Sequence, residues 1–160
     1  MIQDNDLLKL LELFPDKPWH WSCLSYNPNI SWDFISNNLD KSWDWYYLGK
    51  NPSISWDIIS NNLDKSWNWD SLSQNPNLSL KIVKKNLNKP WNWACLSQNQ
   101  KITCDIVNSL ICRLKLNWNW NYLSYNPNIS WNIIKKNLDK PWNWKHICYS
   151  NKNITMDIIK

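Results

Sequence analysis

Residues 27–50 read NPNISWDFISNNLDKSWDWYYLGK, and residues 51–74 return to the same pattern as NPSISWDIISNNLDKSWNWDSLSQ. Self-similarity at a fixed period of this length is typical of tandem repeats that stack one supersecondary unit on the next. The pair Trp-x-Trp marks the repeat six times: the first four copies are 24 residues apart, the next step is 27 residues and the last is again 24. Its members are Trp19, Trp21, Trp43, Trp45, Trp67, Trp69, Trp91, Trp93, Trp118, Trp120, Trp142 and Trp144.

Each repeat carries the signals of a first short helix. A hydroxyl residue stands where its oxygen can accept a hydrogen bond from the free amides of a first helical turn, and these residues are Ser31, Ser55, Ser79, Thr103, Ser130 and Thr155. Ile30 and Ile35 flank the first of these caps at the spacing of a hydrophobic staple. An asparagine is expected to end each helix in the left-handed conformation, which it adopts more easily than most residues, at Asn38, Asn62, Asn86 and Asn137.

A second helix is expected to run through each Trp-x-Trp. An aspartate suited to the N-cap precedes a Lys-Pro or Lys-Ser pair, and these aspartates are Asp16, Asp40, Asp64 and Asp139. The apolar residues recur at i, i+3 and i+4, which favours helices over strands. The sequence therefore predicts an all-α fold, an α-solenoid of short helical hairpins with a repeat of about 24 residues.

The tryptophans are predicted to be structural. Helices of two turns are marginal alone, and an indole ring supplies more buried area per position than a leucine. Residues i and i+2 of a helix point about 200° apart. One member of the pair Trp43 and Trp45 is therefore expected to pack against the first helix of its own repeat, and the other against a neighbouring repeat.

The whole chain, residues 1–160, is predicted to be a single repeat domain. Residues 1–15 would hold a capping helix, with Asp6 and Glu12 on its polar face, and residues 16–160 the tandem helix pairs. The array stops within a repeat, where Met156, Ile158 and Ile159 lack a partner helix. Self-association through this uncapped C-terminal end is a further expectation.

Composition excludes several classes of protein. The chain has 15 Trp but a single Gly, which rules out glycine-rich phosphate loops and dinucleotide fingerprints. Its five cysteines form no Cys-x-x-Cys pair, so neither a metal site nor a disulfide framework is expected. No apolar run approaches the roughly 20 residues of a membrane span, and no secretory signal is visible. We expect an intracellular protein without cofactor, metal or membrane.

Charge and one variable position supply the candidate binding residues. Residues 1–80 carry a net charge of −5 and residues 81–160 a net charge of +10, and a basic half of this kind can attract polyanions or acidic protein surfaces. The basic candidates are Lys84, Lys85, Lys89, Arg113, Lys115, Lys135, Lys136 and Lys140. One second-helix position, which we call the variable column, holds Cys23, Tyr47, Ser71, Cys95, Tyr122 and His146. Its exposed aromatic candidates are Tyr47, Tyr122 and His146.

One asparagine recurs in every repeat, four times directly before proline. These asparagines could form a ladder of ligands, but we interpret them as turn residues whose amides satisfy loop backbone groups. They are Asn27, Asn51, Asn75, Asn99, Asn126 and Asn151. No Ser/His/Asp or Cys/His arrangement recurs, so we predict a protein that is not an enzyme.

The pattern Asn-Pro-Asn-Ile-Ser/Thr-Trp-Asp-Ile-Ile, followed by Asn-Leu-Asp-Lys-Pro-Trp-Asn-Trp, resembles the tandem repeats in proteins of giant DNA viruses of the mimivirus kind. The resemblance covers residues 16–160, and abundant Asn, Ile and Lys with scarce Gly and Ala suit an AT-rich genome. It implies a viral protein in the host cytoplasm, with the virion as a second location, and it brings no catalytic residues. The 27-residue step and the loss of proline at Gln100 and Lys152 depart from the pattern.

Three functions remain open from the sequence. The first is a scaffold for protein–protein interaction, which needs only an extended repeat surface. The second is nucleic-acid binding through the basic C-terminal half. The third and weakest is an enzyme or carbohydrate binder built on exposed tryptophan.

Overall fold

The computed structural model describes residues 6–101 and 118–150, and within these ranges it contains eleven short helices and no strand. The helices are α1 (Asp6–Leu13), α2 (Trp21–Tyr26), α3 (Trp32–Ser36), α4 (Trp45–Lys50), α5 (Trp56–Asn61), α6 (Trp69–Leu72), α7 (Leu80–Lys85), α8 (Trp93–Gln98), α10 (Trp120–Tyr125), α11 (Trp131–Lys136) and α12 (Trp144–Ser150). The predicted all-α class is confirmed, as is the pairing of short helices in the repeats that the structure describes in full.

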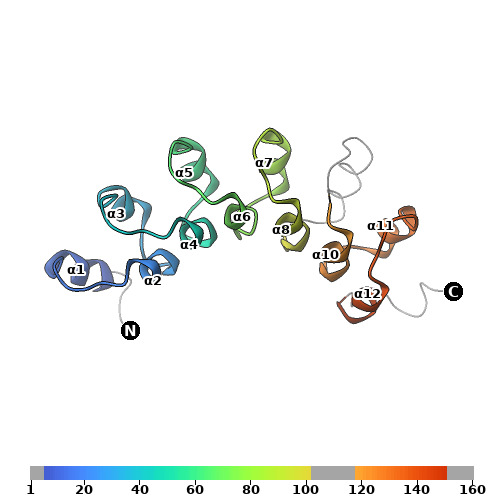
Figure 1. Cartoon of the computed structure of the whole chain (residues 1–160), viewed down its shortest axis with the longest axis horizontal. Helices are drawn as coiled ribbons and strands as arrows, with labels where there is room; N and C mark the ends of the chain where they lie inside the picture. Colours follow the sequence, from blue (N-terminus) through green and yellow to red (C-terminus); the bar gives the residue numbers. More distant parts are fainter. Residues whose placement is uncertain (1–5, 102–117, 151–160) are drawn as a thin grey trace. The chain divides into compact units, whose positions relative to one another are not determined.

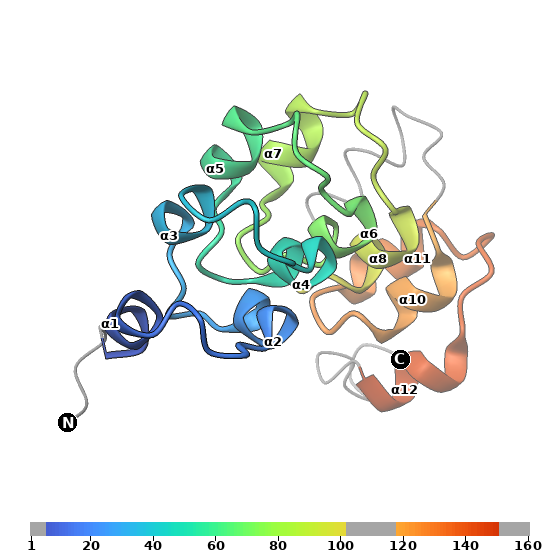
Figure 2. The same ribbon diagram turned by 60° about the vertical axis from the view of Figure 1, so that its left-hand side comes forward.

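The chain forms two compact units, Met1–Asn77 (unit 1) and Leu78–Lys160 (unit 2). In unit 1 the second helices of successive repeats pack in series, α2 against α4 and α4 against α6, while α3 and α5 lie in a separate row (Figure 1). In unit 2, α10 packs against both α8 and α12, and the turned view in Figure 2 shows the same neighbours. Each unit therefore presents a row of second helices.

The described first helices begin directly after their predicted cap residues, but the hydrogen bond of the cap forms at Ser31, Ser55 and Ser79 and not at Ser130. The Ser31 hydroxyl oxygen accepts a hydrogen bond from the Phe34 amide at 3.2 Å, and Ser55 and Ser79 cap α5 and α7 in the same way. The staple residues Ile30 and Ile35 are fully buried. Thr103 and Thr155 lie outside the described residues.

The predicted left-handed helix ends are wrong. No residue has a positive φ in the part of the chain that the structure describes, and the cap residue Asn62 has φ −133°. The asparagine side chain instead donates to a carbonyl four residues back, as from Asn38 to Phe34 at 2.8 Å. Asn62, Asn86 and Asn137 do the same. The amide satisfies a carbonyl that the helix end leaves free, so the backbone has no need to turn left-handed.

The second helix begins later than predicted, at the second tryptophan of each Trp-x-Trp. The residue between the two tryptophans is the N-cap: Asp44 accepts from the amides of Tyr46 and Tyr47, and asparagine takes the same place in later repeats. The first tryptophan stands before the helix, and in five of the six pairs its indole N–H bonds a carbonyl five residues back, as from Trp43 to Asn38 at 2.8 Å; Trp118 is the exception. Asp16, Asp40, Asp64 and Asp139 are therefore not caps.

Three of these aspartates pair with the lysine that follows them. The lysine nitrogen lies 2.7–3.0 Å from the carboxylate in the pairs Asp40–Lys41, Asp64–Lys65 and Asp139–Lys140. The hydrogen bond from the lysine lowers the pKa of each carboxyl below its ordinary value. The pairs are exposed, so they add little to stability.

The tryptophans pack on two sides, as predicted, although only the second of each pair is helical. The first member is buried, except for the half-buried Trp19, and it packs toward the first helix of its own repeat: the rings of Trp43 and Phe34 meet edge to face at 6.3 Å. The second member reaches the next repeat: the rings of Trp45 and Trp67 lie 5.0 Å apart at 87°. The same contact recurs as Trp21–Trp43, Trp93–Trp118 and Trp120–Trp142. Trp144 departs from this pattern, since it is 50% exposed.

The asparagines before proline are turn residues, as predicted, and they also join repeats, which the sequence did not reveal. The Asn51 side chain is fully buried; its oxygen accepts from the Ser53 amide at 2.9 Å. Its nitrogen donates to the carbonyls of Ser25 and Asn27, 2.9 and 3.0 Å away in the preceding repeat. Asn126 bonds Ser97 and Asn99 in the same manner.

Candidate functional site

Exposed aromatic side chains gather on two pairs of second helices, α2 and α4 in unit 1 and α10 and α12 in unit 2. We call the set Tyr122, Tyr125, Lys145, His146 and Tyr149 the aromatic face. The rings of Tyr125 and His146 are stacked, with centroids 3.6 Å apart and planes inclined by 29°. This stack joins two successive repeats, because Tyr125 ends α10 and His146 lies in the first turn of α12.

Two open pockets border the stack. The larger, about 520 Å³, is lined by Tyr125, Lys145, His146, Cys148 and Tyr149. The smaller, about 400 Å³, is lined by Gln98, Tyr122 and Tyr125. Both volumes fall within the range of small-ligand sites, and both have Tyr125 as a wall. Tyr125 therefore stands between two recesses with part of its ring exposed.

Unit 1 carries a related cluster on α2 and α4. The rings of Tyr26 and Tyr47 meet edge to face at 6.0 Å, and Tyr46 contacts Tyr47 at 5.5 Å. The Lys50 ammonium lies 4.2 Å from the centre of the Tyr46 ring, a cation–π contact. Tyr26 and Tyr125 both end the second helix of their repeat, so the two clusters use equivalent positions.

The variable column is exposed or half-buried except at Ser71, where the expectation is wrong. Ser71 is fully buried because Gly49 on α4 leaves room for it: a Cβ built on Gly49 would lie 2.0 Å from the Ser71 hydroxyl oxygen. Elsewhere the position of Gly49 holds serine, as at Ser25 and Ser97, or Cys148. The buried position of Ser71 therefore depends on the absence of a side chain at Gly49. As a result, the variable column has no exposed side chain on α6.

The lysine candidates lie mostly on the first helices of unit 2. Lys84 and Lys85 end α7 and Lys135 and Lys136 end α11, and all four are exposed. Lys89 is half-buried in a turn, and Lys140 is bound to Asp139. Arg113 and Lys115 lie outside the described residues.

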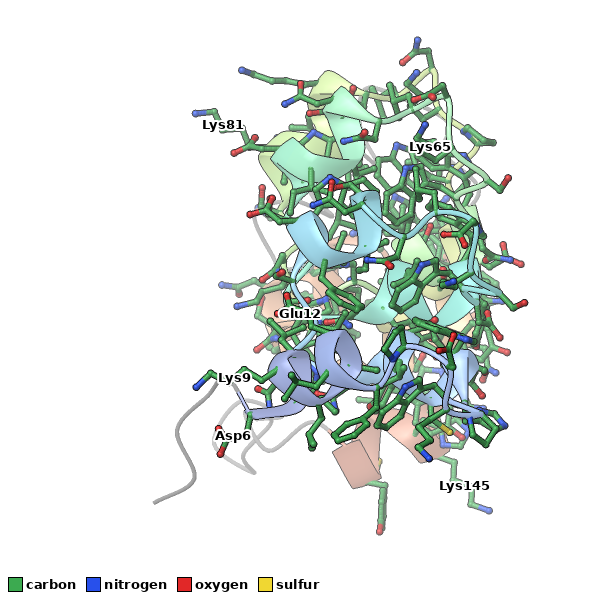
Figure 3. The ribbon with its side chains drawn as sticks, turned by 90° about the vertical axis from the view of Figure 1, so that its left-hand side faces the viewer. Asp6, Lys9, Glu12, Lys65, Lys81 and Lys145 are labelled. Carbon is green, nitrogen blue, oxygen red and sulfur yellow. The ribbon has the colours of Figure 1, made fainter. Side chains whose placement is uncertain are left out.

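The structure thus does not bring the two sets of candidates together. Tyr122 and His146 belong to the row of second helices, while the exposed lysine pairs belong to α7 and α11 (Figure 1). The aromatic face has its own cation, Lys145, whose side chain extends away from the ribbon (Figure 3).

Sequence reasoning missed Tyr125, Lys145 and Tyr149. The signal that could have found them is helical spacing, since Tyr122 and Tyr125, like His146 and Tyr149, are three residues apart and share a face of their helix. These residues lie outside the variable column, so a comparison of that column alone does not include them. All twelve tryptophans of the repeat pairs were predicted to be packed, whereas Trp144, the first residue of α12, is half exposed.

A further pocket in unit 1, about 460 Å³, lies among α1, α2 and α3. Its charged lining consists of Glu12, Asp33 and Lys41, and Figure 3 shows Glu12 on α1. Both signs of charge are present, and Lys41 is already held by Asp40. The pocket therefore selects no particular ligand.

The described residues offer no set of three His, Cys, Asp or Glu side chains that could hold a metal ion. Cys23, Cys95 and Cys148 are free thiols. None of the helices in residues 6–101 and 118–150 is long and apolar enough to cross a membrane.

No protein-family model, curated protein or solved structure matches the chain. Its class therefore follows from the fold and the surface alone. The chain is an all-helical, tryptophan-rich repeat protein whose second helices carry aromatic side chains that change from repeat to repeat.

Proposed function

We propose that the chain is a non-enzymatic repeat scaffold that binds another protein through the exposed side of its second helices. One observation carries the proposal: the residues that recur are used inside the fold, while those that vary lie at the surface. Trp43 and Asn51 are buried and bonded, whereas Tyr47, Tyr122 and His146 at the variable column are exposed or half-buried. Such a division leaves the surface free to differ between repeats without loss of packing.

The chemistry of this surface suits a protein partner. Tyrosine is enriched at protein interfaces because it offers a large, rigid and amphipathic contact at low entropic cost. Tyr26, Tyr47, Tyr122 and Tyr125 would be the main contacts, with Gln98 as an adaptable polar neighbour. Within each unit these contacts belong to packed second helices, α2 and α4 in unit 1 and α8 and α10 in unit 2, and such a row fits an extended partner segment.

The resemblance to giant-virus repeats supports a setting in the host cytoplasm, with the virion as a second location. Affinity capture from nuclease-treated lysate of infected cells tests the scaffold function. We expect the wild-type chain to retain a protein that the variant Tyr122→Ala/Tyr125→Ala/His146→Ala does not retain. A capture profile that is identical for the two chains would contradict the proposal.

Nucleic-acid binding is the second candidate, and charge favours it. The described part of unit 2 has five lysines in residues 78–101 and four in residues 118–150, but Asp139 is its single carboxylate and is bound to Lys140. A surface of this kind attracts phosphate backbones. Binding of a labelled oligonucleotide that weakens steeply with salt would support this function, and no binding at low salt would exclude it.

Self-association through Met156, Ile158 and Ile159, which lie outside the described residues, is a further proposal. Light scattering over a range of concentrations tests it: a mass that rises with concentration is expected, and a constant monomer mass would count against it.

A further inference from the structure

We propose that α10 and α12 form a base-stacking site for single-stranded nucleic acid, in which Tyr125 and His146 supply the platform and Lys145 contacts the phosphate backbone. The proposal rests on the second candidate function and names both the form of nucleic acid and the place where it binds. The proposed site does not include the exposed lysines of α7 and α11, which lie on first helices, whereas α10 and α12 are second helices.

The platform is already formed between two repeats. Tyr125 and His146 lie ring to ring at 3.6 Å, so each ring turns one face to the other and leaves its second face for a ligand. The pocket of about 520 Å³ begins at this pair and continues to Tyr149, which is 87% exposed. Aromatic rings separated by open space are the arrangement on which successive unpaired bases stack.

The charges around the platform select an anion. No Asp or Glu occurs in α8, α10 or α12, and the residues that cap α8 and α10 are the neutral Asn92 and Asn119. Lys145 lies in the wall of the larger pocket, and no ion pair holds it among the residues that the structure describes. An aromatic recess with a free cation and no carboxylate accommodates a base together with its phosphate.

The tyrosine cluster of unit 1 supplies the contrast. It has exposed rings too, but Asp44 caps α4 and Asp70 lies in the first turn of α6. Lys50, its cation, is engaged with the ring and the hydroxyl of Tyr46. Phosphate is repelled by the two carboxylates, so the same ring types make a poorer site for nucleic acid there.

Single strands are favoured over duplexes for a geometric reason. Bases in a duplex are stacked on one another, and their faces become available only when they are unpaired. The site also supplies few charges, so its salt dependence is shallow. With one or two phosphate contacts, the slope of log K against log salt is about −0.7 to −1.4 for a single strand.

The test is a fluorescence-anisotropy titration of the full-length protein with a labelled single-stranded 12-mer and with the same 12-mer annealed to its complement. Tyr125→Ala removes half of the platform; since stacking on one base is worth about 1–3 kcal/mol, we expect affinity for the single strand to fall by roughly 5- to 150-fold. Tyr26→Ala is the matched control, because it removes the equivalent exposed ring of unit 1, and we expect less than a twofold change. Circular dichroism verifies that both variants are folded.

A second set of variants separates this site from the general nucleic-acid function. We expect Lys135→Ala/Lys136→Ala to leave binding of the single strand nearly unchanged and Lys145→Ala to weaken it. Strong loss with the α11 pair, together with no loss for Tyr125→Ala, would overturn the stacking site and leave nucleic-acid binding standing. No binding of either oligonucleotide at low salt would overturn both.

Two further outcomes decide the nature of the ligand. Equal affinity for the duplex, or a slope much steeper than the range above, would overturn the stacking site, since both are signs of binding to phosphates alone. Polyglutamate serves as a competitor that has charge but no bases. We expect it to compete poorly, and displacement of the oligonucleotide at equal charge concentration would assign the surface to acidic protein segments instead.

Discussion

Replacement of Asn51 by alanine is expected to destabilise unit 1 by about 3 kcal/mol. The side chain is fully buried and makes two kinds of contact: its oxygen holds the turn through Ser53, and its nitrogen bonds the carbonyls of Ser25 and Asn27 in the preceding repeat. A net hydrogen bond contributes about 1 kcal/mol, and a buried carbonyl left without a partner costs about 1–3 kcal/mol. The amide bond of the turn and the two inter-repeat bonds give this estimate. The Ser53 hydroxyl also donates to the Asn51 oxygen, but it keeps the Ile30 carbonyl as an acceptor at 3.0 Å, so its loss adds little.

Asn27→Ala is the matched control. Asn27 makes the same turn bond, from the Asn29 amide at 2.9 Å, and its side chain is only half-buried. We therefore expect its loss to cost about 1 kcal/mol, which leaves a difference of about 2 kcal/mol for the inter-repeat bonds of Asn51. Urea denaturation followed by far-ultraviolet circular dichroism measures both values, provided that the m-value is unchanged. Equal costs for the two variants would refute the conclusion that Asn51 joins repeats.

Three other predictions concern packing and charge. Gly49→Ser should cost about 1–3 kcal/mol in urea denaturation, since the new Cβ meets the Ser71 hydroxyl, and the added change Ser71→Ala should recover part of the loss; no loss for the single variant would contradict the close contact. Trp142→Ala should cost about 3–5 kcal/mol and Trp144→Ala roughly half as much, because Trp144 stays half exposed, and a reversed order in thermal unfolding would be inconsistent with the packing. The pKa of the Asp139 carboxyl lies below its ordinary value because the lysine that follows donates a hydrogen bond; its small stabilisation is present above the ordinary pKa and is lost as pH falls through the lowered one. In the variant Lys140→Ala, an NMR titration should show a higher pKa for the Asp139 carboxyl. An unchanged pKa would exclude the hydrogen bond between Lys140 and Asp139.

The sequence was sufficient for the parts of the fold that depend on local signals. Serine caps with their flanking isoleucines predicted the first helix at Ser31 and Ser55, because a hydroxyl and a staple act within one turn. The period of about 24 residues predicted that each repeat holds a helix pair. Both signals are local in the chain, so no knowledge of neighbouring repeats was needed.

The start of the second helix could not be predicted in the same way. Asp40 and Asp44 are both acceptable N-caps by residue type, and the choice between them depends on the Trp43 indole, which bonds Asn38 and holds the chain extended. The left-handed cap failed for a related reason, since an asparagine amide has a second way to satisfy a helix end. Local propensity leaves such alternatives open, and a tertiary contact selects one.

The candidate site was only half predictable. Tyr122 and His146 were found because they vary within a fixed pattern, but Tyr125, Lys145 and Tyr149 gain their meaning from the neighbouring repeat. The sequence also gives the net positive charge of the C-terminal half. It does not show that the exposed lysine pairs lie on the first helices α7 and α11, apart from the aromatic side chains of the second helices. Apart from the tryptophan pairs, the contacts between repeats were not predictable from the sequence.

The central claim is that the tryptophan pairs join one repeat to the next, and a double-mutant cycle on Trp45 and Trp67 tests it most directly. Their rings meet edge to face at 5.0 Å across two repeats. With each tryptophan replaced by leucine, singly and together, urea denaturation should give a coupling energy of about 0.5–1.5 kcal/mol. Costs that add to within about 0.3 kcal/mol would contradict the claim, because the two rings would then stabilise their own repeats independently.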